Sequence, residues 1–148
     1  MKPIRTYILI ADGARARLLL SEGRGKPLTE VPGSDQRQDI RPDHEISAER
    51  PGRVHESANI ARHAIERDDL HRREKERFAQ ALAADLDRRM AGREYGRLII
   101  AAAPETLGII RSALSEKVRA VVLGEVAKDL TKLPNAQVRA LLGDDLPV

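Results

Sequence analysis

A short β-type hydrophobic run lies near the start of the chain. Residues 6–11 read Thr-Tyr-Ile-Leu-Ile-Ala, and the Asp12-Gly13 dipeptide that follows adopts positive φ at low energetic cost in tight turns. The return run, residues 14–20, alternates at first and places Arg15 and Arg17 on one face. This pattern predicts a β-hairpin, and residues 28–31 are expected to form a third, short strand.

The regular pattern stops after residue 31. Between residues 32 and 69, prolines and glycines interrupt charged residues, and no period of 2 or 3.6 is sustained. The interrupting residues are Pro32, Gly33, Pro42, Pro51 and Gly52. Compact domains seldom carry so long a structureless stretch without using it. We therefore expect a long polar excursion over residues 32–69, which is either a mobile surface segment or a binding loop.

A helical pattern begins at Leu70. Apolar residues recur four positions apart, with two alanines beside them on the same stripe: Phe78, Leu82, Leu86 and Met90, with Ala79 and Ala83. Asp68 and Asp69 favour the start of a helix, and Gly92 favours its end. We predict one long amphipathic helix between these signals.

Residues 97–103 form a second apolar run. It is too short for a helix and is bounded by Gly96 and Pro104, which predicts a central strand covered on both faces. Pro104 also suits the first turn of a helix, which we expect to continue through Leu114.

Shorter elements follow. Residues 115–119 are expected to form a helical turn, and residues 134–142 a short helix. Residues 120–127 fit either a helix or a strand that ends near Val126, and their β-branched valines favour the strand. The order of elements predicts a single three-layer-like α/β domain over residues 1–148. Its mixed sheet combines an N-terminal antiparallel hairpin with parallel crossovers.

Composition narrows the function classes. The 148 residues include no cysteine, which excludes disulfides, thiolate metal sites and cysteine nucleophiles. Only three residues are aromatic, so the core must be aliphatic. No classical signal peptide is recognised, and no apolar stretch approaches the ~20 residues of a membrane helix. We expect a cytoplasmic protein that does not use a membrane.

The net charge of +3 and a pI near 9.5 invite a nucleic-acid interpretation. However, the chain has no contiguous basic tract, and most arginines alternate with acids as on a solvated helix face. Scarce aromatics also argue against recognition of single strands by base stacking. The basic residues therefore form either a solvated surface or a patch for phosphate contacts.

Four histidines lie in or beside the polar middle region and have acidic neighbours: His44, His55, His63 and His71. Clustering of this kind is compatible with a metal or acid–base site, but no HxH or HxxxH pair brings two imidazoles together. The glycines at positions 23 and 25 lack the following helix that a phosphate loop requires. We therefore expect no cofactor, no metal ligand and no catalytic residue.

The main alternative to a binding function depends on Asp12. A mixed sheet that begins with a hairpin and continues with parallel crossovers is similar to the ribonuclease H architecture. In that architecture, carboxylates on the strands hold two metal ions, and Asp12 would fit the position on the first strand. The later strand supplies only Glu105, beyond its proline. A single carboxylate at a turn is more often turn chemistry. A metal-dependent hydrolase or nuclease that uses Asp12 or the middle histidines remains the alternative function.

Several separated motifs together resemble the bacterial host attachment protein family. They are PIRTYILIADGARAR at residues 3–17, RPGR at 50–53, HRREK at 71–75 with Phe78-Ala79, Leu107-Gly108, and KDLT at 128–131. The resemblance runs nearly from end to end. That family is in turn similar to the middle domain of archaeal and eukaryotic peptide-chain release factors, which implies a strand, an exposed loop, a long helix and another strand in that order.

In a release factor, the loop before the long helix carries a Gly-Gly-Gln tripeptide. The corresponding residues 51–57 have neither the second glycine nor the glutamine, so the resemblance does not extend to peptide release. It implies instead a non-enzymatic cytosolic binding or regulatory domain that engages the ribosome or structured RNA. The expected phosphate-contacting residues are Arg50, Arg53, His55, Arg62, His63, Arg72 and Arg73. A homo-oligomer, in which the excursion becomes ordered, is a further expectation.

Overall fold

The computed structural model describes residues 5–23, 25–38, 57–91 and 96–143, with side chains from residue 61 onward in the third range. A hairpin of β1 (Thr6–Ala11) and β2 (Arg15–Ser21) comes first, followed by two-residue strands β3 (Thr29–Glu30) and β4 (Gln36–Arg37). The remaining elements are α2 (Ser57–Met90), β5 (Arg97–Ala102), α3 (Pro104–Ala113), α4 (Glu116–Ala120), β6 (Val122–Val126) and α5 (Asn135–Leu142).

The six strands form one mixed sheet, and the mixed sheet was predicted. Strand β4 was not, because its two residues fall within the expected excursion. The order is β3-β2-β1-β5-β6, and β4 pairs with the same strand as β3, at the other end of β2. The β1–β2, β2–β3 and β2–β4 pairs are antiparallel, whereas β1–β5 and β5–β6 are parallel. The strand alternative for residues 120–127 is therefore the correct one, since β6 completes the parallel side.

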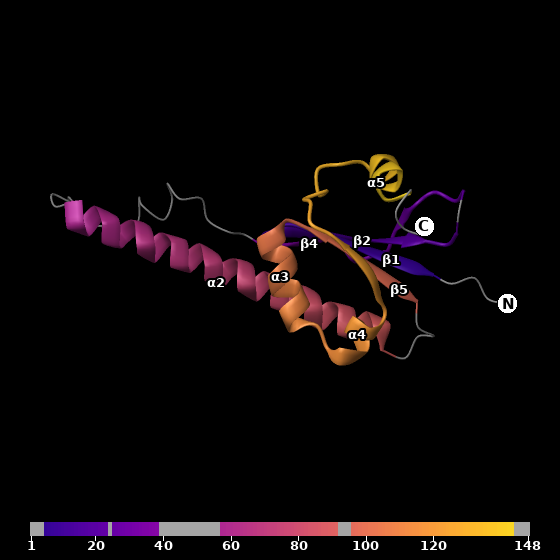
Figure 1. Cartoon of the computed structure of the whole chain (residues 1–148), viewed down its shortest axis with the longest axis horizontal. Coiled ribbons are helices and arrows are strands. Elements are labelled where there is room, and N and C mark those ends of the chain that lie inside the picture. Colours follow the sequence, from indigo (N-terminus) through magenta and orange to yellow (C-terminus); the bar gives the residue numbers. More distant parts are fainter. Residues whose placement is uncertain (1–4, 24, 39–56, 92–95, 144–148) are drawn as a thin grey trace.

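Helices cover both faces of this sheet (Figure 1). On one face, Leu9 and Ile100 join a core with Leu82 of α2, Ile110 of α3 and Val118 of α4. On the other face, the alternate strand residues, such as Ile8 and Ile99, pack against Val138 and Leu142 of α5. Because successive strand residues point to opposite faces, a fully apolar strand such as β1 supplies both cores at once. The predicted three-layer arrangement is confirmed.

The long helix begins much earlier than predicted. It starts at Ser57, so residues 57–69 are helical and were wrongly assigned to the polar excursion. This part has no apolar stripe that would have revealed it. Extending an existing helix costs far less than nucleating one, so the helix that the sheet stabilises continues into the polar sequence. Residues 39–56 of the expected excursion lie outside the described residues.

The hairpin turn also differs from the expectation. Gly13 has no positive φ; the positive-φ glycines of the described chain are Gly23, Gly25 and Gly33. Instead, Asp12 Oδ1 accepts hydrogen bonds from the backbone N–H groups of Ala14 and Arg15, at 2.7 and 2.6 Å. A side chain thus closes the turn. The glycine leaves room for Lys75, because a Cβ at this position would lie 3.0 Å from Cγ of Lys75 and that side chain would have to shift.

α2 is long but strongly charged. None of the helices within the described ranges is both long enough and apolar enough to cross a membrane.

Candidate functional site

Helix α2 has two parts with different surroundings. In residues 61–77 no side chain is buried, whereas six of the thirteen residues 78–90 are buried: Phe78, Ala79, Leu82, Ala83, Leu86 and Met90. We call residues 57–77 the projecting segment and residues 78–90 the anchored segment. Figure 1 shows the first part of α2 extending past the sheet.

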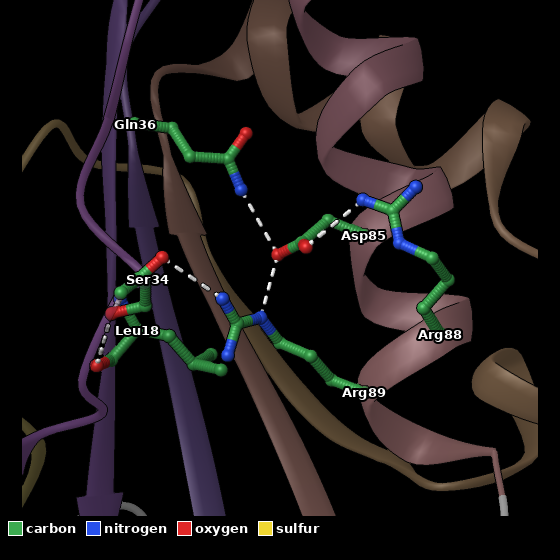
Figure 2. A network of polar contacts seen from close by, with 7 residues as sticks. Leu18, Ser34, Gln36, Asp85, Arg88 and Arg89 are labelled. Atoms are coloured by element: carbon green, nitrogen blue, oxygen red, sulfur yellow. Dashed lines mark hydrogen bonds and ion pairs between the residues drawn. The ribbon is translucent and has the colours of Figure 1, made fainter.

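Asp85 ties the anchored segment to the hairpin side of the sheet (Figure 2). Its carboxylate accepts hydrogen bonds from Gln36 Nε2 at 2.9 Å, from Arg89 Nε at 2.7 Å and from Arg88 at 3.2 Å. Arg89 also donates to the carbonyl of Gly33 at 3.0 Å. Hydrogen bonds to charged groups stabilise by about 1.5–3 kcal/mol where water is excluded, and by less at an exposed pair such as Arg88 and Asp85. This network fixes the direction in which the helix leaves the sheet.

A second set of contacts lies where the two segments meet. Gln38 Nε2 donates to the carbonyl of Glu74 at 2.8 Å. The stem of Lys75 lies against Gly13, and its ammonium lies 3.8 Å from a carboxylate oxygen of Glu105. At this junction α2 is therefore contacted by the end of the hairpin, by the residue after β4 and by the start of α3.

Four arginines of the projecting segment make no hydrogen bond or ion pair with any described residue. They are Arg62, Arg72, Arg73 and Arg77, and all four are exposed. At 100° per residue, Arg73 lies about 20° and Arg77 about 60° from Arg62 around the helix axis. Arg72 lies about 80° to the other side of Arg62. Three of the four therefore follow one face of the helix, and we call them the arginine line (Arg62, Arg73, Arg77).

The structure tests the placement of the predicted residues in part. Arg62, Arg72 and Arg73 are exposed on the projecting segment, and His63 is half-buried with its Nδ1 3.7 Å from Glu66, an ion pair only when the imidazole is protonated. Arg77 was missed, although its spacing of four from Arg73 puts it on the same face. The predicted loop residues lie outside the described residues: Arg50, Arg53 and His55.

Asp12 serves the turn. Besides the two backbone hydrogen bonds to its Oδ1, its Oδ2 accepts a hydrogen bond from the Thr131 hydroxyl at 3.3 Å. Of the four histidines, His63 and His71 lie on α2, while His44 and His55 lie outside the described residues. Within the described ranges, no three His, Asp or Glu side chains are grouped so that they could hold a metal ion.

Shifted pKa values occur at another place, between α3 and β6. The Arg111 guanidinium donates hydrogen bonds to the Glu125 carboxylate, at 2.9 and 3.2 Å from Nε and with a further one from Nη2. These hydrogen bonds, with coulombic attraction, lower the pKa of Glu125 and raise the pKa of Arg111. The pair is largely exposed and joins two elements of the fold. We assign it a structural role.

A comparison with known families gives one result. The family model described as "Protein required for attachment to host cells" matches residues 7–142, which is nearly the whole chain. No curated protein matches the chain.

Proposed function

The chain belongs to the family of proteins required for attachment to host cells, and we propose that it acts as a non-enzymatic binding domain that engages the ribosome or structured RNA. The contact surface in this proposal is the projecting segment of α2, with the arginine line at its centre. The family description names a cellular outcome, which a regulatory domain inside the cell can influence without touching a host surface.

The observation that carries the proposal is that these arginines have no partner among the residues that the structure describes. In the anchored segment, Arg88 and Arg89 are held by Asp85 and stabilise the fold. In the projecting segment, the arginine line and Arg72 have no partner among the described residues. A guanidinium that the fold does not use keeps all five of its donors for an external oxyanion.

The spacing of the arginine line suits a nucleic-acid backbone. Fifteen residues separate Arg62 from Arg77, which corresponds to about 22 Å along a helix with a rise of 1.5 Å per residue. Contacts over such a length reach several phosphates of a folded RNA, and phosphate contacts position a protein without reading sequence. Glu66 and Asp69 lie on the same side of the helix as the arginine line and limit its net charge. We therefore expect modest affinity with strong dependence on salt.

Co-sedimentation of the full chain with ribosomes, and gel-shift assays with a structured RNA, test this proposal over a range of salt concentrations. The wild type should bind, and added salt should release it. Replacing the arginine line with glutamine should remove most of the binding, and each lost phosphate contact should lower the slope of log K against log salt by about 0.7–0.9. The matched control is Arg88→Gln, which removes an exposed arginine from the anchored segment.

Arg50→Gln with Arg53→Gln forms a separate arm, because the sequence predicts that this loop contributes. Binding that is absent at low salt, or that is equally strong in the wild type and the arginine-line variant, would contradict the proposal. Sedimentation of the protein alone in the same runs reports self-association, which would instead favour the expected homo-oligomer.

A further inference from the structure

Three arginines gather on the sheet face opposite to α2. The β2–β4 register places Arg37 directly opposite Arg15, and residues paired across antiparallel strands share a face. Arg17 lies two residues along β2 and therefore on that face as well. With Glu30, Asp35 and Thr131, these side chains line a hollow of about 210 Å³. We call it the arginine hollow.

The fold holds one wall of the arginine hollow firmly. Arg17 donates from Nη1 to the carbonyl of Thr131 at 2.8 Å and from Nη2 to the carbonyl of Leu133 at 2.5 Å. These hydrogen bonds join β2 to the segment before α5. Its Nε is buried and has no hydrogen-bond partner in the described structure. Arg17 thus positions the wall and leaves one buried donor unused.

The other two arginines form a local conflict. Like charges directly opposite each other across strands destabilise a sheet. Arg15 is partly compensated, since its Nε lies 3.9 Å from Asp12 Oδ2, but that carboxylate also serves the turn. Arg37 is exposed and makes no hydrogen bond or ion pair within the described part of the chain. Local conflicts of this kind are expected mainly at functional or strained sites.

We propose that the arginine hollow binds the phosphate group of a sugar phosphate monoester. Guanidinium groups match oxyanions with pairs of parallel hydrogen bonds. Arg15 and Arg37 stand opposite each other on neighbouring strands, and both line the hollow. The two acids of the lining, Glu30 and Asp35, can accept hydrogen bonds from sugar hydroxyls. Inorganic phosphate has no sugar hydroxyls to donate to these two acids, so their negative charge should weaken its binding relative to a sugar phosphate.

This site is independent of the binding role proposed for α2. It lies on the α5 side of the sheet and uses no residue of the projecting segment. Two sources present the same chemistry: a free sugar phosphate, and the 5′-phosphorylated end of an RNA.

Isothermal titration calorimetry of the full chain tests the proposal with ribose 5-phosphate, with inorganic phosphate, and with a short RNA carrying either a 5′-phosphate or a 5′-hydroxyl. Ribose 5-phosphate should bind more tightly than inorganic phosphate. Arg37→Gln should weaken binding at least about tenfold, because a charge-assisted pair of hydrogen bonds is lost. Arg88→Gln, which removes the same charge elsewhere, should leave the affinity unchanged.

The results of these titrations distinguish a free sugar phosphate from the 5′-phosphorylated end of an RNA. Binding of ribose 5-phosphate that is sensitive to Arg37→Gln supports a free metabolite. Binding of the 5′-phosphorylated RNA alone, with the same sensitivity, supports an RNA end. Failure of both probes to bind, or equal affinity in the wild type and Arg37→Gln, overturns the proposal without affecting the test of the α2 surface.

A folding measurement accompanies the titration. Because Arg37→Gln removes a like-charge pair, its urea midpoint should equal or exceed that of the wild type. Ribose 5-phosphate should raise the midpoint of the wild type and have less effect on the variant, since a ligand stabilises only the state that it binds. A midpoint that falls in the variant without ligand would show that Arg37 supports the fold, and would overturn the assignment.

Discussion

The anchored and projecting segments of α2 belong to one continuous helix, and each contains as many acids as arginines, yet they have different roles. In residues 78–90 an apolar stripe is buried and the arginines are bound to Asp85. In residues 61–77 nothing is buried, and four arginines have no partner among the described residues. Burial holds the first segment in place, and helix propagation extends the second from it. The comparison shows that the same side chain stabilises the fold in one environment and is available to a partner in another.

The largest expected effect is the loss of an apolar contact in the anchored segment. Leu82 is 1% exposed, so Leu82→Ala leaves a cavity and should lower the free energy of unfolding by about 2–5 kcal/mol. Ile65 of the projecting segment is 62% exposed, and Ile65→Ala should change the free energy of unfolding by no more than about 0.5 kcal/mol. Urea denaturation measures both. Similar losses would break the distinction between the two segments.

A second test removes the carboxylate that anchors the helix. Asp85→Ala leaves Gln36 and Arg89 without their acceptor and should cost about 1–3 kcal/mol of unfolding free energy. Asp68→Ala is the matched control, because it makes the same change in the same helix at an exposed residue that has no partner among the described residues. Thermal or urea unfolding compares the pair. Equal effects would mean that the Asp85 network contributes nothing beyond helix propensity.

The junction between the segments gives a smaller effect. Gln38→Glu replaces the amide donor that bonds to the Glu74 carbonyl with a carboxylate, and should cost about 1 kcal/mol. Gln80→Glu adds the same charge at an exposed position of α2 and serves as the control. Hydrogen exchange should also quicken in residues 61–77 of Gln38→Glu. Unchanged exchange there would show that this bond does not steady the projecting segment.

The smallest effect concerns the exposed pair outside α2. Because Arg111 lowers the pKa of Glu125, the stability from this pair is present above the unfolded pKa of about 4.3 and is lost as the pH falls through the folded pKa. The urea midpoint of Glu125→Gln should therefore lie slightly below that of the wild type at pH 7, and the two should converge in acid. If the two urea midpoints still differ at the lowest pH, the loss of stability in Glu125→Gln comes from packing and not from the ion pair. The difference between the two urea midpoints at pH 7 thus measures how much a paired surface arginine stabilises this fold.

Much of the architecture follows from local pattern. The apolar runs of β1 and β5 predict strands because a strand covered on both faces has no polar side to show. Pro104 marks the start of α3, and the four-residue spacing from Phe78 to Met90 predicts the anchored segment. Arg62, Arg72 and Arg73 were proposed from the sequence. The tertiary structure adds that the helix reaches back past Arg62 and that these arginines, with Arg77, have no partner among the described residues.

The sequence by itself determined strands β1, β2 and β5 and the anchored half of the long helix, because each depends on the apolar pattern within one short segment. Only the tertiary structure decided where α2 begins, since Ser57 carries no apolar signal and the helix reaches it by propagation. It alone also placed Arg37 opposite Arg15, because β4 has two residues and its register depends on contacts of Gln36 and Gln38 with a helix far along the chain. The periodicity of apolar residues in the sequence indicates which side of a helix or strand is buried. Whether two polar side chains far apart in the sequence come into contact depends on how the elements pack against each other.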